Sequence, residues 1–245
     1  MLHIRKAREM IDLLIPCYNE DSNVKTLVEQ WKTIVLENQN IMVHFIDNGS
    51  TDNTLKVLIN EISKANSKNL NLIKVPKNKG YGFGIKYGIS ETNNKYICWT
   101  HADLQISATD VQSLIGKFLL SDDKDNYIYM GKRENRKTLD LFFTSMMSVI
   151  TFIFSGFYFK DINAQPKIFS RSLVKNLEKL PNDFNLDLAL LISSRKAGYK
   201  IKLFNLIFYN RAFNLAKGGG SIKGKLILSF STLNYLFANI SFLKK

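Results

Sequence analysis

Two side chains with oxygen donors follow a short apolar run and could together hold a divalent cation. Residues 96–99 are typical of a buried strand, and Asp103 and Gln105 lie in the polar turn directly after it. Open α/β sheets bind ligands beyond the carboxyl ends of their strands. Because Mg²⁺ prefers one or two carboxylates together with phosphate oxygens of the substrate, this turn predicts a metal site that holds a pyrophosphate. The structural alternatives are a helix cap or turn residue for Asp103 and an ordinary polar surface residue for His101.

Three more polar loops follow predicted strands, so a doubly wound sheet would bring all four loops to one edge. The ring of Tyr18 and the carboxylate of Glu20 could bind a base or ribose, and Asp47 could accept hydrogen bonds from a base edge. Acidic residues also favour helix starts and turns, which is the alternative for these side chains. The loop at 78–84 has more glycines than a connector needs, but their spacing matches neither a P-loop nor the dinucleotide fingerprint.

Basic and hydroxyl side chains later in the chain could bind the leaving phosphates. The candidates are Arg133, Arg211, Ser221 and Lys223, and Lys217 competes with Lys223 for the role. The planar fork of arginine matches phosphate oxygens, although a solvated surface position is the alternative for each residue. The sequence contains no Ser-His-Asp constellation, no HExxH motif and no CxxC pair. The common hydrolase and zinc chemistries are therefore excluded.

The charge distribution indicates an anionic partner. The chain has a formal net charge of +13, and ten Lys and Arg residues follow Asp187 without a further Asp or Glu. Such asymmetry is typical of proteins that bind nucleic acid, a membrane surface or phosphorylated ligands, with a merely soluble basic surface as the alternative. No nucleic-acid recognition motif accompanies the charge, so we expect no nucleic-acid partner.

Length and composition indicate one sizeable ordered domain, since the 245 residues are 45% hydrophobic. Cys17 and Cys98 fit neither a disulfide framework nor a zinc spacing, which predicts buried thiols in a reducing compartment. The charged residues 1–10 do not have the pattern of a signal peptide. We therefore expect a cytoplasmic protein.

The elements that must position these side chains alternate between strand and helix. Apolar runs typical of buried parallel strands are separated by apolar residues at helical spacing. The predicted strands are 11–15, 41–46, 70–75, 96–99, 127–130, 166–170 and 199–208, and the predicted helices are 24–36, 54–62, one ending near 91, 111–120 and 186–197. This alternation predicts an α/β fold with a mostly parallel sheet and helices on both faces.

Two longer apolar stretches interrupt the alternation, at 139–159 and 225–243. The polar residues of the first fall on one helical stripe: Asp140, Thr144, Ser148, Thr151 and Ser155. In the second stretch Ser231, Asn234 and Ser241 fall near one face. The pattern favours amphipathic helices that lie on a membrane surface or pack against the domain, and a buried core helix is the alternative for 139–159.

An ordered set of motifs resembles the family 2 glycosyltransferases with the GT-A fold. The segments are IDLLIPCYNEDSNV, FIDNGSTDNT, NKGYGFGIKYGI, WTHADLQ, GKRENR, DINAQPKIF and RAFNLAKGGGSIK. They are most similar to the branch of dolichol-phosphate mannosyltransferase and the bacterial polyprenyl-phosphate glycosyltransferases. The resemblance implies a GT-A, Rossmann-like domain over residues 1–225 and a C-terminal amphipathic helix over 226–245.

The resemblance also implies roles for individual residues in an inverting sugar transfer from a GDP- or UDP-sugar. Nucleotide binding would fall to Pro16, Tyr18, Glu20, Asp47, Lys79, Gly80, Ala102 and Asp103. Mg²⁺ or Mn²⁺ binding would fall to Asp103, Gln105 and His101, and Asp103 would also count among the catalytic residues. Arg133, Arg211, Ser221 and Lys223 would bind phosphates, and Arg133 and Arg211 would also neutralise charge during catalysis, as the metal does. The chain departs from the family where His101 stands in place of the first Asp of Asp-x-Asp. Imidazole ligates Mn²⁺ but is a poorer ligand than carboxylate for Mg²⁺.

The acceptor implied by the resemblance is a polyprenyl phosphate at the cytoplasmic face of an anionic membrane, in glycolipid or surface-polysaccharide assembly. Such an acceptor is already an anion and needs no strong general base. A sugar hydroxyl of a lipid-linked glycan is the alternative acceptor and would need a catalytic base, for which Asp187 is the candidate. A binder of nucleotide-sugars without turnover is an alternative of another class, suggested by His101. The membrane-spanning C-terminal helices of some family members are not expected here, so we expect peripheral attachment.

Overall fold

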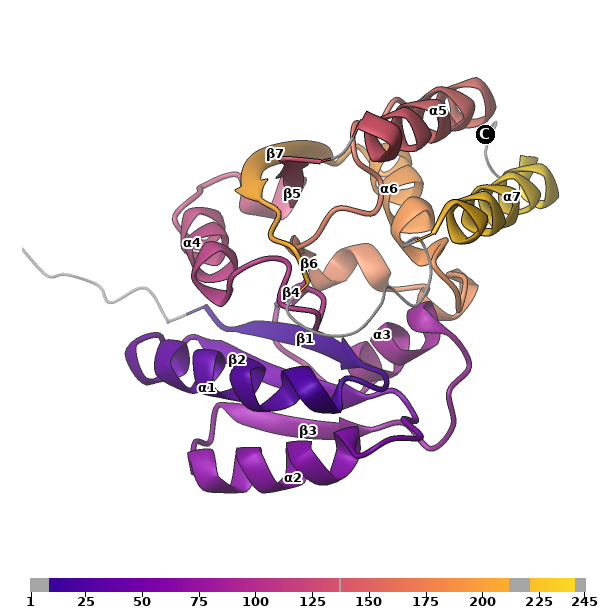
Figure 1. Cartoon of the computed structure of the whole chain (residues 1–245). Helices are drawn as coiled ribbons and strands as arrows, with labels where there is room; N and C mark the ends of the chain where they lie inside the picture. The colour runs from indigo at the N-terminus through magenta and orange to yellow at the C-terminus, as the bar shows by residue number, and fades with distance from the viewer. Residues whose placement is uncertain (1–8, 137, 212–220, 241–245) are drawn as a thin grey trace, which may run out of the picture.

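The computed structural model describes residues 9–136, 138–211 and 221–240 of the chain. In these residues seven strands form one sheet in the order β3-β2-β1-β4-β6-β5-β7 (Figure 1). The strands are β1 (Ile11–Cys17), β2 (Ile41–Asp47), β3 (Leu70–Lys74), β4 (Tyr96–Trp99), β5 (Tyr127–Glu134), β6 (Lys167–Ser170) and β7 (Lys200–Ile207). Among the described strands only β6 runs antiparallel to its neighbours. The predicted mostly parallel sheet is confirmed.

Helices cover both faces of the sheet. One face packs against α1 (Asp21–Glu37), α2 (Thr54–Ala65) and α4 (Ala108–Leu119), and the other against α3 (Tyr81–Ser90) and α6 (Leu186–Lys196). Side chains alternate between the faces, so Leu13 and Ile15 of β1 join the first core and Leu14 joins the second. Short 3-10 helices lie at η1 (Lys124–Asn126), η2 (Arg171–Val174) and η3 (Leu177–Lys179), which the sequence did not predict. The side chains of Cys17 and Cys98 are buried thiols, as expected.

The first strand continues past the proline that was expected to end it. Pro16 lies within β1, where it is paired with Ile46 of β2. The pairing of β1 with β4 ends at Leu14. Pro16 lies beyond this pairing, so β4 does not need a hydrogen bond from the N–H that proline lacks. The strands β1 and β4 diverge there, and such a switch point is where doubly wound sheets open a ligand crevice.

Hydrogen bonds tie the loops after β1, β2 and β3 to one another. Asn48 N donates to Cys17 O at 2.8 Å, and Val75 N donates to Asp47 O at 2.9 Å. Asn19, in the left-handed region at φ 53, donates its backbone N–H to Ser50 Oγ at 3.1 Å. These bonds fix the backbone on which the candidate nucleotide-binding side chains are carried.

A buried ionic network holds the opposite, amino-terminal edge of the sheet. The carboxylate of Asp12 lies 2.9 Å from His44 Nε2 and accepts from Asn94 Nδ2 at 2.7 Å and from Arg171 Nη2 at 2.8 Å. Burial opposes ionisation of Asp12, but the hydrogen bonds from His44 and Asn94 outweigh it and lower its pKa. Because Arg171 follows β6, the network joins the parallel half of the sheet to the antiparallel strand.

Helices α5 (Thr138–Ser155) and α7 (Ile222–Ala238) lie side by side at one end of the molecule, away from β1, β2 and β3 (Figure 1). Phe154 and Phe237 meet edge to face with ring centroids 4.7 Å apart, and Lys225 forms an ion pair with Asp140. The two long apolar stretches of the sequence therefore form one paired unit.

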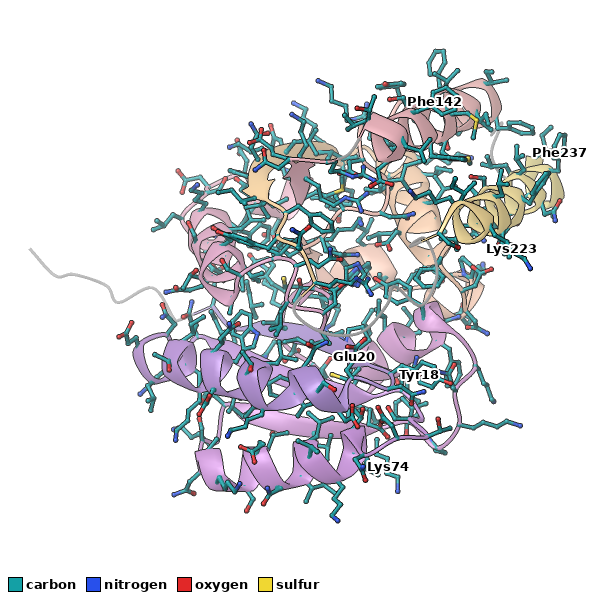
Figure 2. All side chains as sticks on the ribbon, in the orientation of Figure 1. Tyr18, Glu20, Lys74, Phe142, Lys223 and Phe237 are labelled. Atoms are coloured by element: carbon teal, nitrogen blue, oxygen red, sulfur yellow. The ribbon has the colours of Figure 1, made fainter. Side chains whose placement is uncertain are left out.

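The polar stripe of α5 faces the protein and its apolar side faces outward. Ser148, Thr151 and Ser155 are buried, whereas Phe142 and Ile153 are 62% and 70% exposed. By length and composition α5 could cross a membrane, with a mean hydropathy of 1.5. Only 11% of that helix is buried, so the core-helix alternative is wrong. Figure 2 shows Phe142 on α5 and Phe237 on α7 pointing away from the sheet.

Candidate active site

The four loops predicted to carry chemistry meet at the carboxyl edge of the sheet. Tyr18 and Glu20 follow β1, and Figure 2 shows them close together at the end of that strand. Glu20 is buried and accepts a 2.6 Å hydrogen bond from Asn23 Nδ2. Asp47 is buried at the end of β2, where its Oδ1 accepts from Ser50 N at 3.2 Å. The predicted nucleoside-binding side chains therefore share one edge.

The loop after β4 presents two oxygen donors on the same side. Leu104 adopts φ 58, in the left-handed region, which a non-glycine residue seldom occupies. Its side chain packs against the core, and Asp103 Oδ1 accepts from Gln105 N at 3.2 Å. The turn is thereby closed, and Asp103 Oδ2 and Gln105 Oε1 both contact the guanidinium of Arg211.

The chemistry of these donors fits a divalent metal bound jointly by protein and substrate. Within the described residues no group of three or more His, Cys, Asp and Glu side chains could hold a metal by itself. One carboxylate, Asp103, and one amide oxygen, Gln105, are the type of partial ligand set that Mg²⁺ and Mn²⁺ complete with phosphate oxygens. Ala102 is buried beside Asp103. Burial lowers the pKa of His101, which favours its neutral form.

A buried polar cluster lies beside His101 and contains Asp187, the candidate base. Asp187 Oδ1 lies 2.7 Å from Lys167 Nζ and accepts from Gln165 Nε2 at 3.0 Å and Trp99 Nε1 at 3.3 Å. Lys167 is fully buried, and burial lowers its pKa despite the Asp187 carboxylate. The carboxylate of Asp187 is thus occupied as the counter-ion of a buried ammonium group.

Tyr81 connects this cluster to the start of α3. Its hydroxyl accepts from Gln165 Nε2 at 3.1 Å, and its ring lies 5.8 Å from the ring of His101. Burial and the nearby Asp187 raise the pKa of Tyr81 well above its ordinary value, so the phenol stays protonated. Tyr81 also stacks on Phe184 with ring centroids 4.9 Å apart.

Arg133 is held by a carboxylate that the sequence analysis did not single out. Its Nε and Nη2 donate to Asp161 at 3.0 and 2.5 Å, and its backbone N donates to Asp161 Oδ2 at 3.2 Å. Burial alone would raise the pKa of Asp161, but the bonds from Arg133 lower it. Arg136 lies 3.6 Å from the same carboxylate. Two guanidinium groups therefore share one buried counter-ion, which leaves net positive charge at the start of α5.

The glycines of the 78–84 loop have a packing reason. A Cβ on Gly80, which adopts φ +113, would lie 2.4 Å from Asn182 O, and one on Gly84 would lie 2.6 Å from the side chain of Asn48. The loop must therefore be glycine-rich to fit between two neighbouring loops. Lys79 is exposed, with its ammonium group 5.1 Å from the centroid of the Phe83 ring.

The remaining phosphate candidates lie at the start of α7. Ser221 caps this helix by accepting from Gly224 N at 3.0 Å, and Lys223 is exposed in the first turn (Figure 2). Within the described residues, neither side chain forms a hydrogen bond or an ion pair with Asp103 or Arg133. Lys217 lies outside the described residues.

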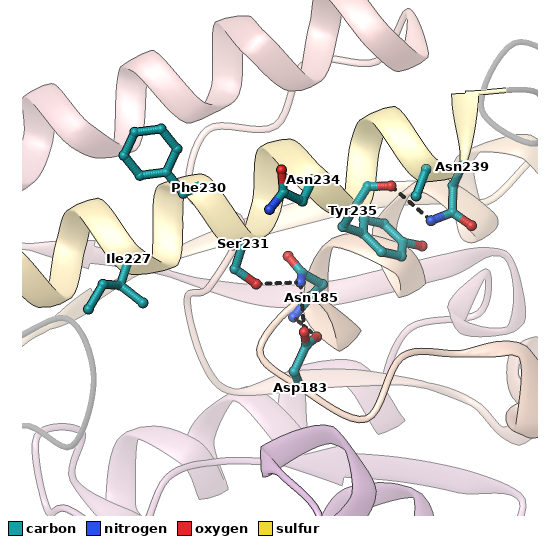
Figure 3. Close-up of a pocket in the computed structure, with 9 residues that line it drawn as sticks. Asp183, Asn185, Ile227, Phe230, Ser231, Asn234, Tyr235 and Asn239 are labelled. Carbon is teal, nitrogen blue, oxygen red and sulfur yellow. Dashed lines mark hydrogen bonds between the residues drawn. The ribbon is translucent and has the colours of Figure 1, made fainter.

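A groove of about 610 Å³ runs between α7 and the turn that precedes α6 (Figure 3). Asn185 donates to Ser231 Oγ at 3.2 Å and to Asp183 Oδ2 at 3.0 Å across its floor. Ile227 and Phe230 supply apolar surface on the α7 side. Phe184, between Asp183 and Asn185, stacks on Tyr81, so the groove adjoins the Asp187 cluster.

Sequence reasoning missed four polar residues of this site: Tyr81, Asp161, Gln165 and Lys167. Three of them precede or begin β6, because this antiparallel strand brings its start to the edge where parallel strands end. A search for polar residues after strands passes over them. The signal was the segment DINAQPKIF, which carried part of the family resemblance without an assigned role.

Several curated proteins of known activity are similar to this chain. A UDP-N-acetylglucosamine–dolichyl-phosphate N-acetylglucosaminyltransferase of Methanococcus voltae is 29% identical, over 71% of this chain and 74% of that protein. A dolichyl-phosphate beta-glucosyltransferase of Dictyostelium discoideum is also 29% identical, over 54% of this chain and 42% of that protein. The chain thus covers less than half of the Dictyostelium enzyme.

Solved structures share the fold. Glucosyl-3-phosphoglycerate synthase from Mycobacterium tuberculosis, in complex with Mn²⁺, UDP and glucosyl-3-phosphoglycerate, matches with a TM-score of 0.73 at 15% identity. The match covers 95% of this chain and 80% of that one. The sequence model of glycosyl transferase family 2 matches residues 12–186, well over half of the chain. The chain therefore belongs to glycosyltransferase family 2 and is a nucleotide-sugar-dependent glycosyltransferase.

Proposed function

We propose that this enzyme transfers a sugar from a UDP-sugar to a polyprenyl phosphate at a membrane surface, with inversion at the sugar carbon. UDP is favoured over GDP because the Methanococcus relative is named for a UDP-sugar and the Mycobacterium structure holds UDP. A polyprenyl phosphate acceptor is favoured by two relatives named for dolichyl phosphate.

The observation that carries the proposal is the position of the basic residues relative to the outward apolar helices. Arg133 lies near the end of β5 and Arg136 just before α5, and Ser221 and Lys223 lie at the start of α7. The outer faces of both helices are apolar, with Phe142 and other large side chains exposed. An acceptor phosphate bound near Arg133 and Arg136 would therefore leave its hydrocarbon chain beside an apolar surface, as a lipid-linked substrate requires.

The residues of the site divide the reaction as follows. Tyr18, Glu20 and Asp47 bind the nucleoside. Asp103 and Gln105 would hold a divalent metal, which would neutralise charge on the diphosphate. An oxygen of the acceptor phosphate forms the new bond to the sugar C1 while the bond from C1 to the diphosphate breaks. The bonding electrons leave with the nucleoside diphosphate, and basic side chains stabilise that charge.

A phosphate acceptor also agrees with the surroundings of Asp187. A hydroxyl acceptor would need a base that can gain a proton, but protonating Asp187 would leave the buried Lys167 without its counter-ion. A phosphate oxygen attacks as an anion and needs no such proton transfer. Asp187 then serves to position Gln165 and Tyr81.

The test is a transfer assay with acceptors of different chemistry. Purified enzyme with Mn²⁺ would be given radiolabelled UDP-glucose, UDP-N-acetylglucosamine or GDP-mannose, and undecaprenyl phosphate or dolichyl phosphate in vesicles. We expect label from one UDP-sugar in the organic phase, released again into water by mild acid, which cleaves the bond between the sugar and the lipid phosphate. 3-Phosphoglycerate, glycerol and a lipid-linked disaccharide would be run as competing acceptors. Transfer only to a hydroxyl of one of these would contradict the proposal.

A further inference from the structure

The guanidinium of Arg211 lies on the two oxygen donors of the proposed metal site. Its Nη2 donates to Asp103 Oδ2 at 2.8 Å, and its Nε donates to Gln105 Oε1 at 3.1 Å. One planar group with a permanent positive charge thus bridges both side chains. Arg211 has the position that a cation bound by these same two oxygens would take.

The backbone next to Arg211 is fastened to the same loop. Tyr209 N donates to Gln105 O at 2.9 Å, and Gln105 Nε2 donates to Tyr209 O at 3.2 Å. This pair of bonds joins the segment after β7 to the loop after β4. The side chain of Arg211 remains 27% exposed, so it can leave the two oxygens without breaking the backbone contact.

A guanidinium and a divalent cation cannot occupy this position together. Each would need Asp103 Oδ2 and Gln105 Oε1, and two positive charges at such short range in a partly buried site repel each other strongly. Asp103 is buried, so it needs one positive partner at all times. The pair Asp103–Arg211 meets this need when no metal is bound.

We propose that Arg211 competes with the divalent metal for Asp103 and Gln105. Metal arriving with the donor displaces the guanidinium, which then turns to the diphosphate beside it. The inference rests on the proposed function only in taking Asp103 and Gln105 as the metal ligands. Its consequence is that the free enzyme binds metal weakly, and that the extra positive charge of Arg211 reaches the diphosphate only after the metal has bound.

The test measures Mn²⁺ binding without donor, acceptor or turnover. Water proton relaxation enhancement would give the Mn²⁺ affinity of the wild-type enzyme and of Arg211→Ala and Arg211→Gln. We expect both variants to bind Mn²⁺ about tenfold more tightly or better, a change that corresponds to about 1.4 kcal/mol of removed competition. Arg211→Gln keeps most of the side-chain volume, so a folding defect of the alanine variant would not decide the result.

Two further variants locate the effect. Arg195→Ala removes the same charge from the end of α6, where Arg195 bonds to Tyr199 O, and should leave the Mn²⁺ affinity unchanged. Adding Asp103→Asn to Arg211→Gln should abolish the gained affinity. Equal affinity in wild type and both Arg211 variants, or no Mn²⁺ binding in any of them, would overturn the inference. If the affinities change as expected while no polyprenyl phosphate is glycosylated, the proposed acceptor is wrong and the competition stands.

Discussion

At the scale of single residues, the contacts of Asp187 differ from those that a catalytic base would need. The sequence offered it as a base because it is acidic and matches a family position. In the structure its carboxylate accepts from Trp99 and Gln165 and pairs with the fully buried Lys167. A buried ion pair of this kind is costly to break from either side. We therefore expect Asp187 to act mainly on the shape of the site.

This arrangement predicts strong coupling between Asp187 and Lys167. Asp187→Asn and Lys167→Met should each lower the free energy of unfolding by about 3–5 kcal/mol, because each leaves one buried group without its partner. The double variant should lose clearly less than the sum of the two. Urea unfolding of the four proteins gives the coupling energy. Lys175→Met, at an exposed lysine, is the control and should change stability by no more than about 0.5 kcal/mol. Additive losses would contradict the pairing.

Residue types and spacing were sufficient to find Asp47, Asp103 and Gln105 at the edge of the sheet, because parallel strands all end there. They were not sufficient to find that Arg133 is bound to Asp161, since this contact joins β5 to a segment before β6. Ion pairs of this kind depend on whether a strand runs parallel or antiparallel to its neighbours, and a hydrophobic pattern does not predict that direction. The same limit hid the contact between Arg211 and Asp103.

At the scale of elements, the antiparallel strand β6 is held by side-chain hydrogen bonds, because no long helix follows it. Strands β1 to β4 are each followed by a helix that packs onto the sheet, whereas β6 is followed by η2. Arg171, in η2, spans the gap by donating to Asn94 O at 2.6 Å and to Asp12 Oδ2 at 2.8 Å. The strand runs themselves were predictable from apolar patterns, but this fastening was not, because it joins residues far apart in sequence.

We predict that Arg171→Ala lowers the free energy of unfolding by about 1.5–3 kcal/mol, the usual range for a hydrogen bond to a charged group.

Because the folded-state pKa of Asp12 is lowered, the stabilising contribution of its carboxylate is complete above the ordinary Asp pKa and is lost as pH falls through the lower folded value. Asp12→Asn should therefore flatten the acid side of the stability profile. Thermal unfolding between pH 3 and pH 7 measures this. An unchanged profile in Asp12→Asn would refute the role of the network.

At the scale of the whole molecule, the end formed by α5 and α7 exposes more apolar surface than the helices that cover the sheet. The outer faces of α5 and α7 are apolar, and a basic side chain lies near the start of each helix, Arg136 just before α5 and Lys223 in the first turn of α7. A surface of this kind would lie on lipid with its basic residues near anionic headgroups. The sequence predicted the amphipathic stripe of α5, and the structure adds that the polar side of the stripe is the buried one.

Vesicle binding tests this arrangement. We expect the enzyme to sediment with vesicles containing phosphatidylglycerol and less with phosphatidylcholine alone, with salt weakening the attachment. Phe142→Ser combined with Ile153→Ser should lower the vesicle affinity about tenfold or more, since each side chain would lose apolar burial in the membrane. Leu120→Ser and Ile59→Ser are matched controls, because Leu120, directly after α4, is 86% exposed and Ile59, on α2, is 54% exposed. Equal losses in the control pair would argue against a membrane face on α5.

The direction of β6 has one more consequence, for how this architecture can vary. Parallel neighbours require a crossover connection, usually a helix, but antiparallel neighbours can be joined by a tight hairpin. Strands β5 and β6 are antiparallel and adjacent, so the sheet itself does not need α5 between them. That connection can lengthen, shorten or change its chemistry while the strand order stays intact. Evolution could thus change the length and the surface chemistry of this one insert without rebuilding the framework that carries out the reaction.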